Sequence, residues 1–310
     1  MTTWSRGIVP ALLALLAIAA MLGHKHVPNS PGNLGSLLET FLPWLGLSIP
    51  LLAAAALWRR SATAALAAAL TTVVWLGLFG HLVVPGKGGG DHDLRVLTHN
   101  IGASNPDPDG TAAVLLAAEP DIIALQELTD DDLATFGRLL RARYPHHIDS
   151  GTVALWSRHP LRAGEQVDIG IGWPRALRAE AQTPAGPVAV YVAHLASVRV
   201  SPGEGFSSAR RNTTVTQLGE RIAAEKLARV IVMGDFNGTA YDRELAPLTY
   251  GLTSAHAEGG WGFGFSWPAG FPMARIDHIL IRGVTATDAR VLPATASDHR
   301  PVAADLKLAR

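Results

Sequence analysis

The sequence predicts an α/β domain of stacked β-sheets with helices on the outside, preceded by three transmembrane helices. Three observations predict this fold class. Long uncharged segments fall within the first 90 of the 310 residues. The rest of the chain contains many short β-forming runs, and most of these runs are not separated by helical segments. This order favours packed sheets over a doubly wound sheet, in which helices alternate with the strands.

Three apolar segments near the amino terminus have the length of membrane-spanning helices. They cover residues 7–23, 40–58 and 61–85, and each approaches the ~20 apolar residues that a helix needs to cross a bilayer. The alternative for the first segment is a cleaved signal peptide, because Arg6 precedes an Ala/Leu run. The other two segments remain in either case. We therefore assign residues 1–84 to a membrane region.

The basic residues beside these segments predict the orientation of the chain in the membrane. Arg6 and the Arg59–Arg60 pair lie on one side, whereas Lys25 and Lys87 lie on the other. Because cytoplasmic flanks carry the excess of Lys and Arg, we expect the amino terminus in the cytoplasm. The chain is then a multi-pass protein of the cell membrane, and everything after the third helix is extracellular.

A polar, Gly-rich segment at residues 85–93 predicts a flexible linker, so that residues 94–310 form a separate domain. From residue 91 onward the chain has 21 basic and 25 acidic side chains. This balance does not favour a nucleic-acid partner, because affinity for long DNA comes from Lys and Arg, although a local basic patch would suffice. The absence of Cys excludes disulfides, thiolate catalysis and cysteine zinc sites.

The domain contains many β-forming runs and a few helical segments. Strands are expected at residues 94–100, 121–127, 151–157, 176–182, 188–194, 230–235, 276–281, 284–291 and 301–306. Helices are expected at residues 111–118, 129–143, 207–227 and about 243–248. The acidic triplet Asp130–Asp132 opens the second of these helices, where negative charge favours the helix dipole. We interpret it as a cap and not as a metal site.

Polar side chains end six of the apolar runs. Asp235 and Asn237 follow the run that starts at Val230 and, being two residues apart in extended chain, point the same way. A carboxylate and a carboxamide in this arrangement suit a phosphate held beside a hard metal ion. One such residue alone is more often a turn former. The similar positions at the ends of other runs are occupied by Asn100, Glu127, His194, Asp277, Asp298 and His299.

If the sheets gather these ends, one site holds four carboxylates and two or three imidazoles. Like charges at that density coexist around a cation. Carboxylate and amide oxygens without Cys favour Mg²⁺ or Mn²⁺ over a zinc cage. Such a site suits phosphoryl chemistry, because the metal neutralises the phosphate while a His or Asp deprotonates the attacking water.

The order and spacing of these motifs resemble the endonuclease/exonuclease/phosphatase superfamily of metal-dependent phosphoesterases. The resemblance covers about residues 94–306. It is carried by Asn100, Gln126-Glu127, His194, Gly234-Asp235-Phe236-Asn237, Arg275-Ile276-Asp277-His278 and Ser297-Asp298-His299. It implies a four-layer α/β sandwich of two packed mixed β-sheets with outer helices. It also implies that Glu127 is the main Mg²⁺ ligand, with Asn100 and Asp298 nearby.

The resemblance further implies the catalytic roles. Asp235 and Asn237 would act on the nucleophile and the phosphate. His299, oriented by Asp277, would be the base or a donor to the phosphate, and His194 a second phosphate contact. Whether His299 or Asp235 takes the proton from water stays open at this point.

Other residues near these motifs are expected to be structural. His99 and His278 should face away from the site on their strands, and we expect them to pack or to lie at the surface. His146 and His147 are expected in a solvated loop. The Gly- and aromatic-rich residues 259–268 either touch a lipid or ring-bearing substrate or form a surface flap folded over the core.

The membrane-anchored layout is similar to the branch of the superfamily associated with glycopeptide (teicoplanin) antibiotic resistance. This resemblance implies hydrolysis of a lipid-linked phosphate or pyrophosphate, such as undecaprenyl pyrophosphate, outside the membrane. The alternatives are an extracellular nuclease, a sphingomyelinase-like phosphodiesterase and, in another class, a catalytically idle binding module on a membrane stem. No protein partner is predicted.

Overall fold

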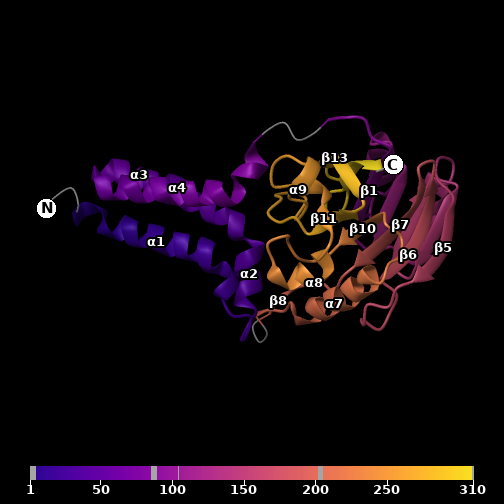
Figure 1. Ribbon diagram of the computed structural model, residues 1–310, viewed down its shortest axis with the longest axis horizontal. Helices are drawn as coiled ribbons and strands as arrows, with labels where there is room; N and C mark the ends of the chain where they lie inside the picture. Colours follow the sequence, from indigo (N-terminus) through magenta and orange to yellow (C-terminus); the bar gives the residue numbers. More distant parts are fainter. Residues whose placement is uncertain (1–4, 85–88, 104, 202–204, 309–310) are drawn as a thin grey trace.

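The computed structural model describes residues 5–84, 89–103, 105–201 and 205–308. A bundle of apolar helices extends from one side of a β-sandwich (Figure 1). The chain therefore forms two parts, a helical bundle and a β-sandwich.

The bundle comes from the first part of the chain. Its elements are η1 (Ser5–Gly7), α1 (Ile8–Gly23), η2 (His24–His26), α2 (Leu34–Thr40), η3 (Leu42–Leu47), α3 (Ser48–Arg59) and α4 (Ala62–Val83). Three segments, Ile8–His26, Leu42–Arg59 and Ala62–Val83, are long and apolar enough to span a membrane. Large side chains such as Leu16 and Leu51 are exposed on the bundle, as expected for helices whose outer surface faces lipid.

Two mixed six-stranded sheets form the sandwich. The first has the order β13-β14-β1-β2-β4-β3, with β1 and β2 parallel. Its strands are β1 (Leu94–Asn100), β2 (Ile122–Gln126), β3 (His146–Ser150), β4 (Val153–Ser157), β13 (Val284–Val291) and β14 (Val302–Leu308). The second has the order β11-β12-β10-β7-β6-β5, with β7 and β10 parallel. Its strands are β5 (Leu161–Gln166), β6 (Ala176–Thr183), β7 (Gly186–His194), β10 (Val230–Asp235), β11 (Thr253–Ser254) and β12 (Asp277–Arg282).

Apolar residues of both sheets fill the space between them, where Val96 and Val190 are fully buried. Helices α5 (Pro108–Ala117) and α6 (Asp130–Leu140) pack on the outer face of the first sheet, and α7 (Ala209–Ala223) packs on the second. The order helix, sheet, sheet, helix confirms the predicted four-layer sandwich. The remaining short elements are β8 (Val200–Ser201), β9 (Gly205–Phe206), η4 (Arg243–Leu245), α8 (Ala246–Thr249) and α9 (Ala255–Gly259).

Two edge strands, β3 and β5, are not predicted from the sequence. His146 and His147 lie on β3 and pair with Ser157 and Trp156 of β4, so the expectation of a loop is wrong. Both strands are largely polar and partly or fully exposed, and they lack the apolar alternation that identifies a strand. Polar side chains are common on edge strands because they discourage pairing with another chain.

The start of α6 confirms the interpretation of the acidic triplet. The Asp132 backbone N–H donates to Thr129 Oγ1 at 3.2 Å, and the Thr129 N–H donates to Asp132 Oδ2 at 3.1 Å. This reciprocal pair is a capping box, which satisfies two backbone donors at the helix start. The triplet therefore begins a helix, as expected.

The aromatic residues of segment 259–268 pack against the helical bundle. Phe265 stacks on Trp44 with ring centroids 5.7 Å apart, and Phe263 lies 6.0 Å from Trp75. The Trp44 indole N–H also donates to the carbonyl of Met273 at 2.8 Å. The proposed flap over the sandwich core is therefore wrong, because these rings cover the membrane region instead. The sequence carries no sign of this pairing, since the partners are about 200 residues apart.

An ion pair between a buried carboxylate and a partly buried arginine joins the two regions. Glu39 is the one acidic residue among the first 90, and it is fully buried. The backbone N–H and the Nη1 group of Arg243 donate to its two carboxylate oxygens, each at 2.9 Å. His24 Nδ1 lies 2.9 Å from the same carboxylate. Because a buried carboxylate is stable only when its charge is compensated, these contacts fix the bundle against the sandwich.

The expected linker lies partly outside the described residues, which exclude 85–88. At its end, the Gly89 N–H donates to the carbonyl of Thr287 at 3.1 Å, and the Asp93 N–H donates to that of Leu306 at 2.9 Å. The chain therefore runs along β13 and β14 before it enters β1.

Candidate active site

Strand pairing brings the predicted site residues to one edge of the sandwich. In the second sheet, Asp235 at the end of β10 is opposite both His194 of β7 and Asp277 of β12. In the first sheet, Asn100 of β1 is opposite Gln126, the residue before Glu127. Asn237, Asp298 and His299 lie on loops at this same edge, so all eight predicted residues converge.

The close pairing of β10 and β7 explains the glycine in the Gly-Asp-Phe-Asn motif. Gly234 has a φ of +145°, and a Cβ at this position would lie 1.8 Å from the carbonyl oxygen of Ala193. A larger residue would push β10 away from β7 and would separate Asp235 from His194. The glycine is therefore required by the close approach of two backbones.

Asp235 is the centre of the site. Asn100 Nδ2 donates to its Oδ2 at 3.1 Å, and the Asn237 backbone N–H donates to its Oδ1 at 2.9 Å. The Nε2 atoms of His194 and His299 lie 3.6 Å and 3.8 Å from Oδ2. Burial, reinforced by the charge of Asp277, raises the pKa of Asp235 to about 7, although His299 opposes this shift. The carboxyl can therefore exchange a proton near neutral pH.

Asp277 and His299 form a buried pair. His299 Nδ1 lies 2.9 Å from Asp277 Oδ2, and Ser266 Oγ donates to the same oxygen at 2.6 Å. Burial lowers the pKa of His299, but the charges of Asp277 and Asp235 outweigh burial and raise it to about 10. Burial raises the pKa of Asp277, and the charge and hydrogen bond of His299 bring it below its usual value. At neutral pH the pair is an imidazolium and a carboxylate.

Glu127 and His194 face each other across the site. Glu127 Oε1 is 3.6 Å from His194 Nε2, and the Ala103 N–H donates to Glu127 Oε2 at 3.1 Å. Glu127 has a φ of +62°, an uncommon conformation for a residue with a side chain that often marks functional positions. Burial, with the charges of Arg175 and His299, holds the pKa of His194 well below its usual value. The ring is therefore neutral, and among the described residues neither nitrogen has a hydrogen-bond partner.

A cavity of about 380 Å³ opens above these residues. Glu127, Asp235 and His299 line it together with Thr40 and Phe41 from the membrane region. The sequence does not indicate this contribution, because α2 and η3 are far from the site in the chain. Trp267 is also missed, although it lies in the aromatic segment that the sequence singled out. Its indole N–H donates to Asp298 Oδ2 at 3.1 Å.

The donors at this edge fit a hard divalent cation. Asp235, Asp277 and His299 offer ligand atoms within 4.8 Å of one another, and Glu127 and Asp298 line the same cavity. Among the described residues, the buried Oδ1 of Asp277 has no hydrogen-bond partner. An oxygen-rich set of this kind suits Mg²⁺ or Mn²⁺.

The two histidines expected to be structural do pack inside the fold. His99 Nε2 is 2.9 Å from Thr295 Oγ1. His278 stacks on Phe236 with ring centroids 5.3 Å apart, and its Nε2 lies 2.8 Å from the Gly238 carbonyl oxygen. Neither ring lines the cavity that the structure describes.

Two packed mixed sheets with an acidic and histidine cluster at their strand ends define a metal-dependent hydrolase of phosphoric esters. The sequence comparison agrees with this class. The chain belongs to the Endonuclease/Exonuclease/phosphatase family, whose model matches residues 97–299. A search of the curated proteins found no match.

Solved structures with the same fold include several kinds of protein. Sphingomyelinase C from Streptomyces griseocarneus is 20% identical, with a TM-score of 0.52 over 68% of this chain and 98% of its own. D. rerio TDP2 complexed with single strand DNA product is 17% identical, with a TM-score of 0.59 over 69% and 98%. A family protein from Bacteroides thetaiotaomicron is 18% identical, with a TM-score of 0.55 over 69% and 94%. At these identities the likeness is one of fold.

The raised pKa of His299 predicts how stability depends on pH. The folded protein retains the proton of His299 up to about pH 10, whereas the unfolded chain loses it near pH 6.5. Protein treated with EDTA should therefore lose stability as pH rises between these values. Asp235 acts in the same direction but only up to about pH 7, so the higher range reports on His299.

Thermal unfolding in detergent, measured across this pH range, tests this account. The melting temperature of Asp277→Asn should fall less steeply with rising pH than that of the wild type, because the variant lacks the carboxylate that raises the pKa of His299. Asp131→Asn, at an exposed position on α6, is the matched control and should follow the wild type. Equal slopes in Asp277→Asn and the wild type would contradict this account of the pair.

Proposed function

We propose that this enzyme hydrolyses a phosphate or pyrophosphate ester carried by a membrane lipid, with a cell-wall lipid carrier such as undecaprenyl pyrophosphate as the substrate. The observation that supports the proposal is the composition of the cavity. One wall comes from the segment between the first and second membrane-spanning helices, at Thr40 and Phe41. A substrate confined to the bilayer would meet the catalytic residues beside this segment.

The cavity also has the apolar surface that a lipid chain requires. Val198, Val200, Phe206 and Ile276 line it together with Phe41. Apolar contacts of this kind favour a hydrocarbon substituent on the phosphate, since each buried methylene contributes about 0.8 kcal/mol. Anchoring of the enzyme in the same membrane raises the effective concentration of such a substrate.

We assign the metal to Glu127 as the main ligand, with Asn100 and Asp298 nearby. Asp277 and His299 are close enough to offer ligand atoms, but they already engage each other at 2.9 Å. A bound Mg²⁺ or Mn²⁺ would supply positive charge to the phosphate oxygens. Glu127 is only partly buried and so can reach both the metal and the cavity.

We assign Asp235 as the base that takes the proton from water, because its carboxylate lies at the centre of the site, within 3.8 Å of both His194 and His299, and because burial raises its pKa. His299 is protonated through its contact with Asp277, so it donates to a phosphate oxygen and does not act as the base. The neutral His194 provides a second contact to the phosphate, and Asn237 positions Asp235 and the phosphate through its amide groups.

The proposed orientation places the catalytic domain, residues 94–310, outside the cell and the amino terminus in the cytoplasm. Arg59 Nη1 donates to the carbonyl of Arg6 at 3.2 Å, so the basic residues that favour the cytoplasm lie at one end of the bundle. That end is the one farther from the sandwich (Figure 1). We divide the chain into the membrane region 1–84, a linker at 85–93 and this domain.

Reporter fusions test the orientation. A reporter that is active only outside the cytoplasm should give signal when fused after Gly90. A fusion at the amino terminus should give signal with a cytoplasmic reporter only. Cytoplasmic signal from the fusion after Gly90 would reverse the proposed orientation.

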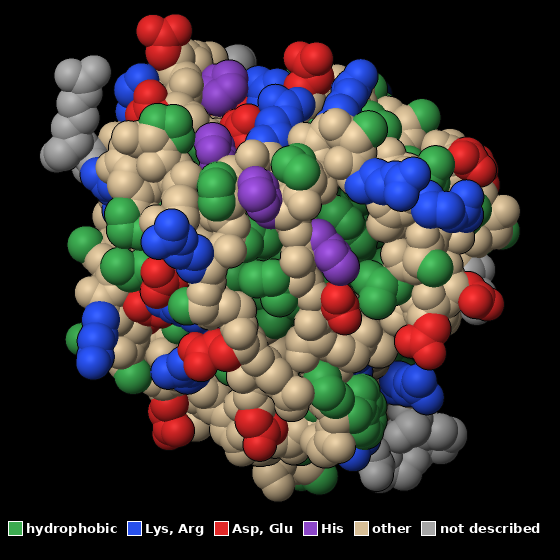
Figure 2. Space-filling view, turned by 90° about the vertical axis from the view of Figure 1, so that its right-hand side faces the viewer, with side chains coloured by type: hydrophobic (Ala, Val, Ile, Leu, Met, Phe, Trp, Pro, Cys, Tyr) green, Lys and Arg blue, Asp and Glu red, His purple; other side chains and the backbone are tan. Residues whose placement is uncertain are grey.

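Nuclease and sphingomyelinase activities are the competing assignments. The solved structures with the same fold include TDP2 in complex with a single strand DNA product and sphingomyelinase C. The face in Figure 2, which points away from the membrane helices, carries interspersed basic and acidic side chains. This face therefore shows no broad basic surface for a long duplex on the side away from the membrane helices. Lipid hydrolysis is favoured by the apolar wall of the cavity.

A substrate panel tests the activity. Purified protein in detergent with Mg²⁺ should release phosphate from a prenyl pyrophosphate in preference to sphingomyelin, inositol phosphate or DNA, and EDTA should abolish the release. Glu127→Gln should lower kcat at least about 100-fold, because removal of a ligand weakens the metal site. Glu220→Gln, exposed on α7, is the control. Cleavage of DNA without phosphate release from the prenyl pyrophosphate would contradict the proposal and would identify the protein as a nuclease.

A second variant tests the wall formed by the membrane region. Phe41→Ala should raise the KM for a long-chain prenyl pyrophosphate about tenfold more than the KM for a soluble aryl phosphate ester, because only the long chain contacts this wall. Tyr250→Ala, which is 88% exposed on the sandwich, is the matched aromatic control. An equal effect of Phe41→Ala on both substrates would contradict a lipid-facing role.

A further inference from the structure

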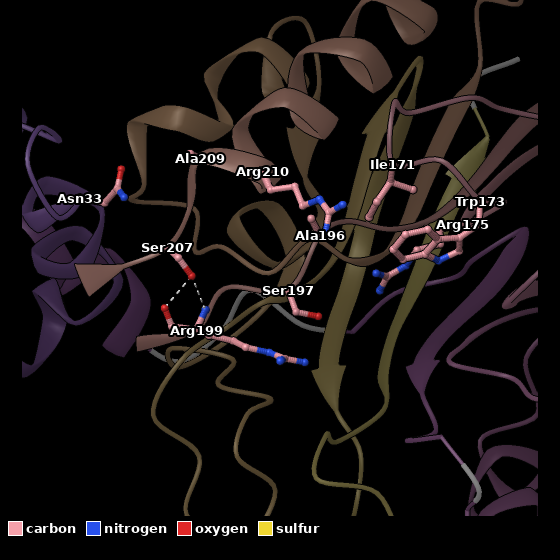
Figure 3. Close-up of a pocket in the computed structure, with 10 residues that line it drawn as sticks. All are labelled: Asn33, Ile171, Trp173, Arg175, Ala196, Ser197, Arg199, Ser207, Ala209 and Arg210. Carbon is pink, nitrogen blue, oxygen red and sulfur yellow. Dashed lines mark hydrogen bonds between the residues drawn. The ribbon is translucent and has the colours of Figure 1, made fainter. Parts of the chain in front are cut away.

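A second cavity, of about 680 Å³, adjoins the catalytic one. Ser197 and Arg199 line both cavities, so the two are contiguous. Figure 3 shows the guanidinium groups of Arg175, Arg199 and Arg210 projecting into this second space from three segments of the chain. We call this second cavity, with its three arginines, the arginine cleft.

Each arginine is placed by a different element. Arg175 directly precedes β6, and its carbonyl accepts the backbone N–H of His194 at 2.9 Å, which ties it to the end of β7. Arg210 lies in the first turn of α7, with its guanidinium 5.7 Å from the centre of the Trp173 ring. The backbone N–H of Arg199 donates to Ser207 Oγ at 3.3 Å. The backbone of the sandwich therefore supports the cleft.

The charges of the arginine cleft lack acidic partners. Its lining contains no Asp or Glu, and none of the three side chains forms an ion pair within the described residues. Arg175 is only 8% exposed and has no hydrogen-bond partner for its side chain among those residues. Burial and the charge of Arg210 lower the pKa of Arg175, while Asp235 and Glu127 act in the opposite direction. Arg175 thus lies close to the catalytic carboxylates.

Two other buried arginines have acidic partners, whereas the buried Arg275 has no hydrogen-bond partner for its Nε and Nη1 atoms within the described residues. Arg178 binds Glu225 at 3.0 Å, and Arg211 binds Asp242 at 2.5 Å. Arg199 and Arg210 are exposed, whereas Arg175 is buried without a counter-charge, which is costly. An anion held between the three guanidinium groups would compensate that buried charge.

The start of α7 contributes to the same space. Its first residues, Ala209 and Arg210, line the cleft, and its N-cap Ser208 forms no capping hydrogen bond from its side chain. Ser208 Oγ is buried, and it has no partner within the described part of the chain. Backbone N–H groups at the start of a helix favour anions, phosphate above all, and arginine complements them.

We propose that the arginine cleft binds a second phosphoryl group of the substrate, adjacent to the one that is hydrolysed. This inference rests on the proposed function and makes it more specific, because it selects a pyrophosphate ester over a monophosphate ester. Each of the two cavities then binds a different part of the substrate. The catalytic cavity holds the phosphoryl group under attack, and the cleft holds its neighbour.

Another source of the same chemistry is the phosphate of an anionic lipid headgroup. Asn33 of the membrane region lines the cleft, so headgroups are close enough to compete. The contiguity through Ser197 and Arg199 and the influence of Asp235 and Glu127 on Arg175 favour the substrate.

Kinetics with the full-length protein in detergent test the proposal. Arg210→Gln should raise the KM for a prenyl pyrophosphate about ten times more than the KM for the matching prenyl monophosphate. The reason is that only the pyrophosphate has a second phosphoryl group, which would lose its contact with Arg210. Arg221→Gln changes an exposed arginine of the same helix and is the matched control, with an unchanged ratio. Arg175→Gln, if it folds, should act in the same direction as Arg210→Gln.

Direct binding separates this inference from the proposed function. Inorganic pyrophosphate should bind the EDTA-treated wild-type protein in calorimetry, and Arg210→Gln should weaken this binding about tenfold while Arg221→Gln should not. If the wild type hydrolyses no prenyl phosphate yet shows this pattern, the proposed function fails and the phosphoryl site stands.

The opposite results overturn the inference. Equal KM ratios and equal pyrophosphate binding in Arg210→Gln and the wild type mean that the cleft does not hold a second phosphoryl group of the substrate. If Arg210→Gln then also loses activation by vesicles of phosphatidylglycerol relative to phosphatidylcholine, the cleft belongs to a lipid headgroup.

Discussion

The pairing of three neighbouring strands is the constraint on which the site depends. β10 lies between β7 and β12, and their register places Asp235 directly opposite both His194 and Asp277. This register requires the close approach of β10 to β7 at Gly234. It gathers buried acidic and imidazole groups that shift one another's pKa values, so that Asp235 and His299 hold protons that isolated side chains would not. The catalytic chemistry is thus a consequence of backbone packing.

The contact between the membrane region and the sandwich determines what this chemistry can reach. The ion pair between the buried Glu39 and the partly buried Arg243 joins the two regions, as do the stacked rings of Trp44 and Phe265. Phe41 consequently becomes part of the cavity wall beside His299. The membrane region therefore does more than tether the domain, because it forms part of the cavity wall. The arginine cleft lies on the other side of Ser197 and Arg199, so apolar and cationic surfaces flank the same catalytic centre.

Prediction from the sequence was accurate where a strong local pattern exists. The strands that end in Asn100, His194 and Asp235 are central and almost wholly buried, and apolar residues make up much of each one, so their presence is clear from the residues themselves. β3 and β5 were missed because an edge strand buries little side chain, so its sequence needs no apolar alternation. The role of segment 259–268 was mistaken for a related reason, since its aromatic composition shows that it packs but not against what.

The sequence by itself determined the class of fold, the three apolar helices and the identity of all eight residues that meet at the strand ends, because strand periodicity, hydropathy and motif order are local properties. Only the tertiary structure decided that Phe41 and Trp267 border the cavity and that Arg175, Arg199 and Arg210 share a cleft. These residues come from separate elements whose proximity depends on long-range packing. Their side chains carry no pattern that distinguishes a binding surface from an ordinary loop, because what distinguishes it is the set of neighbours that folding supplies.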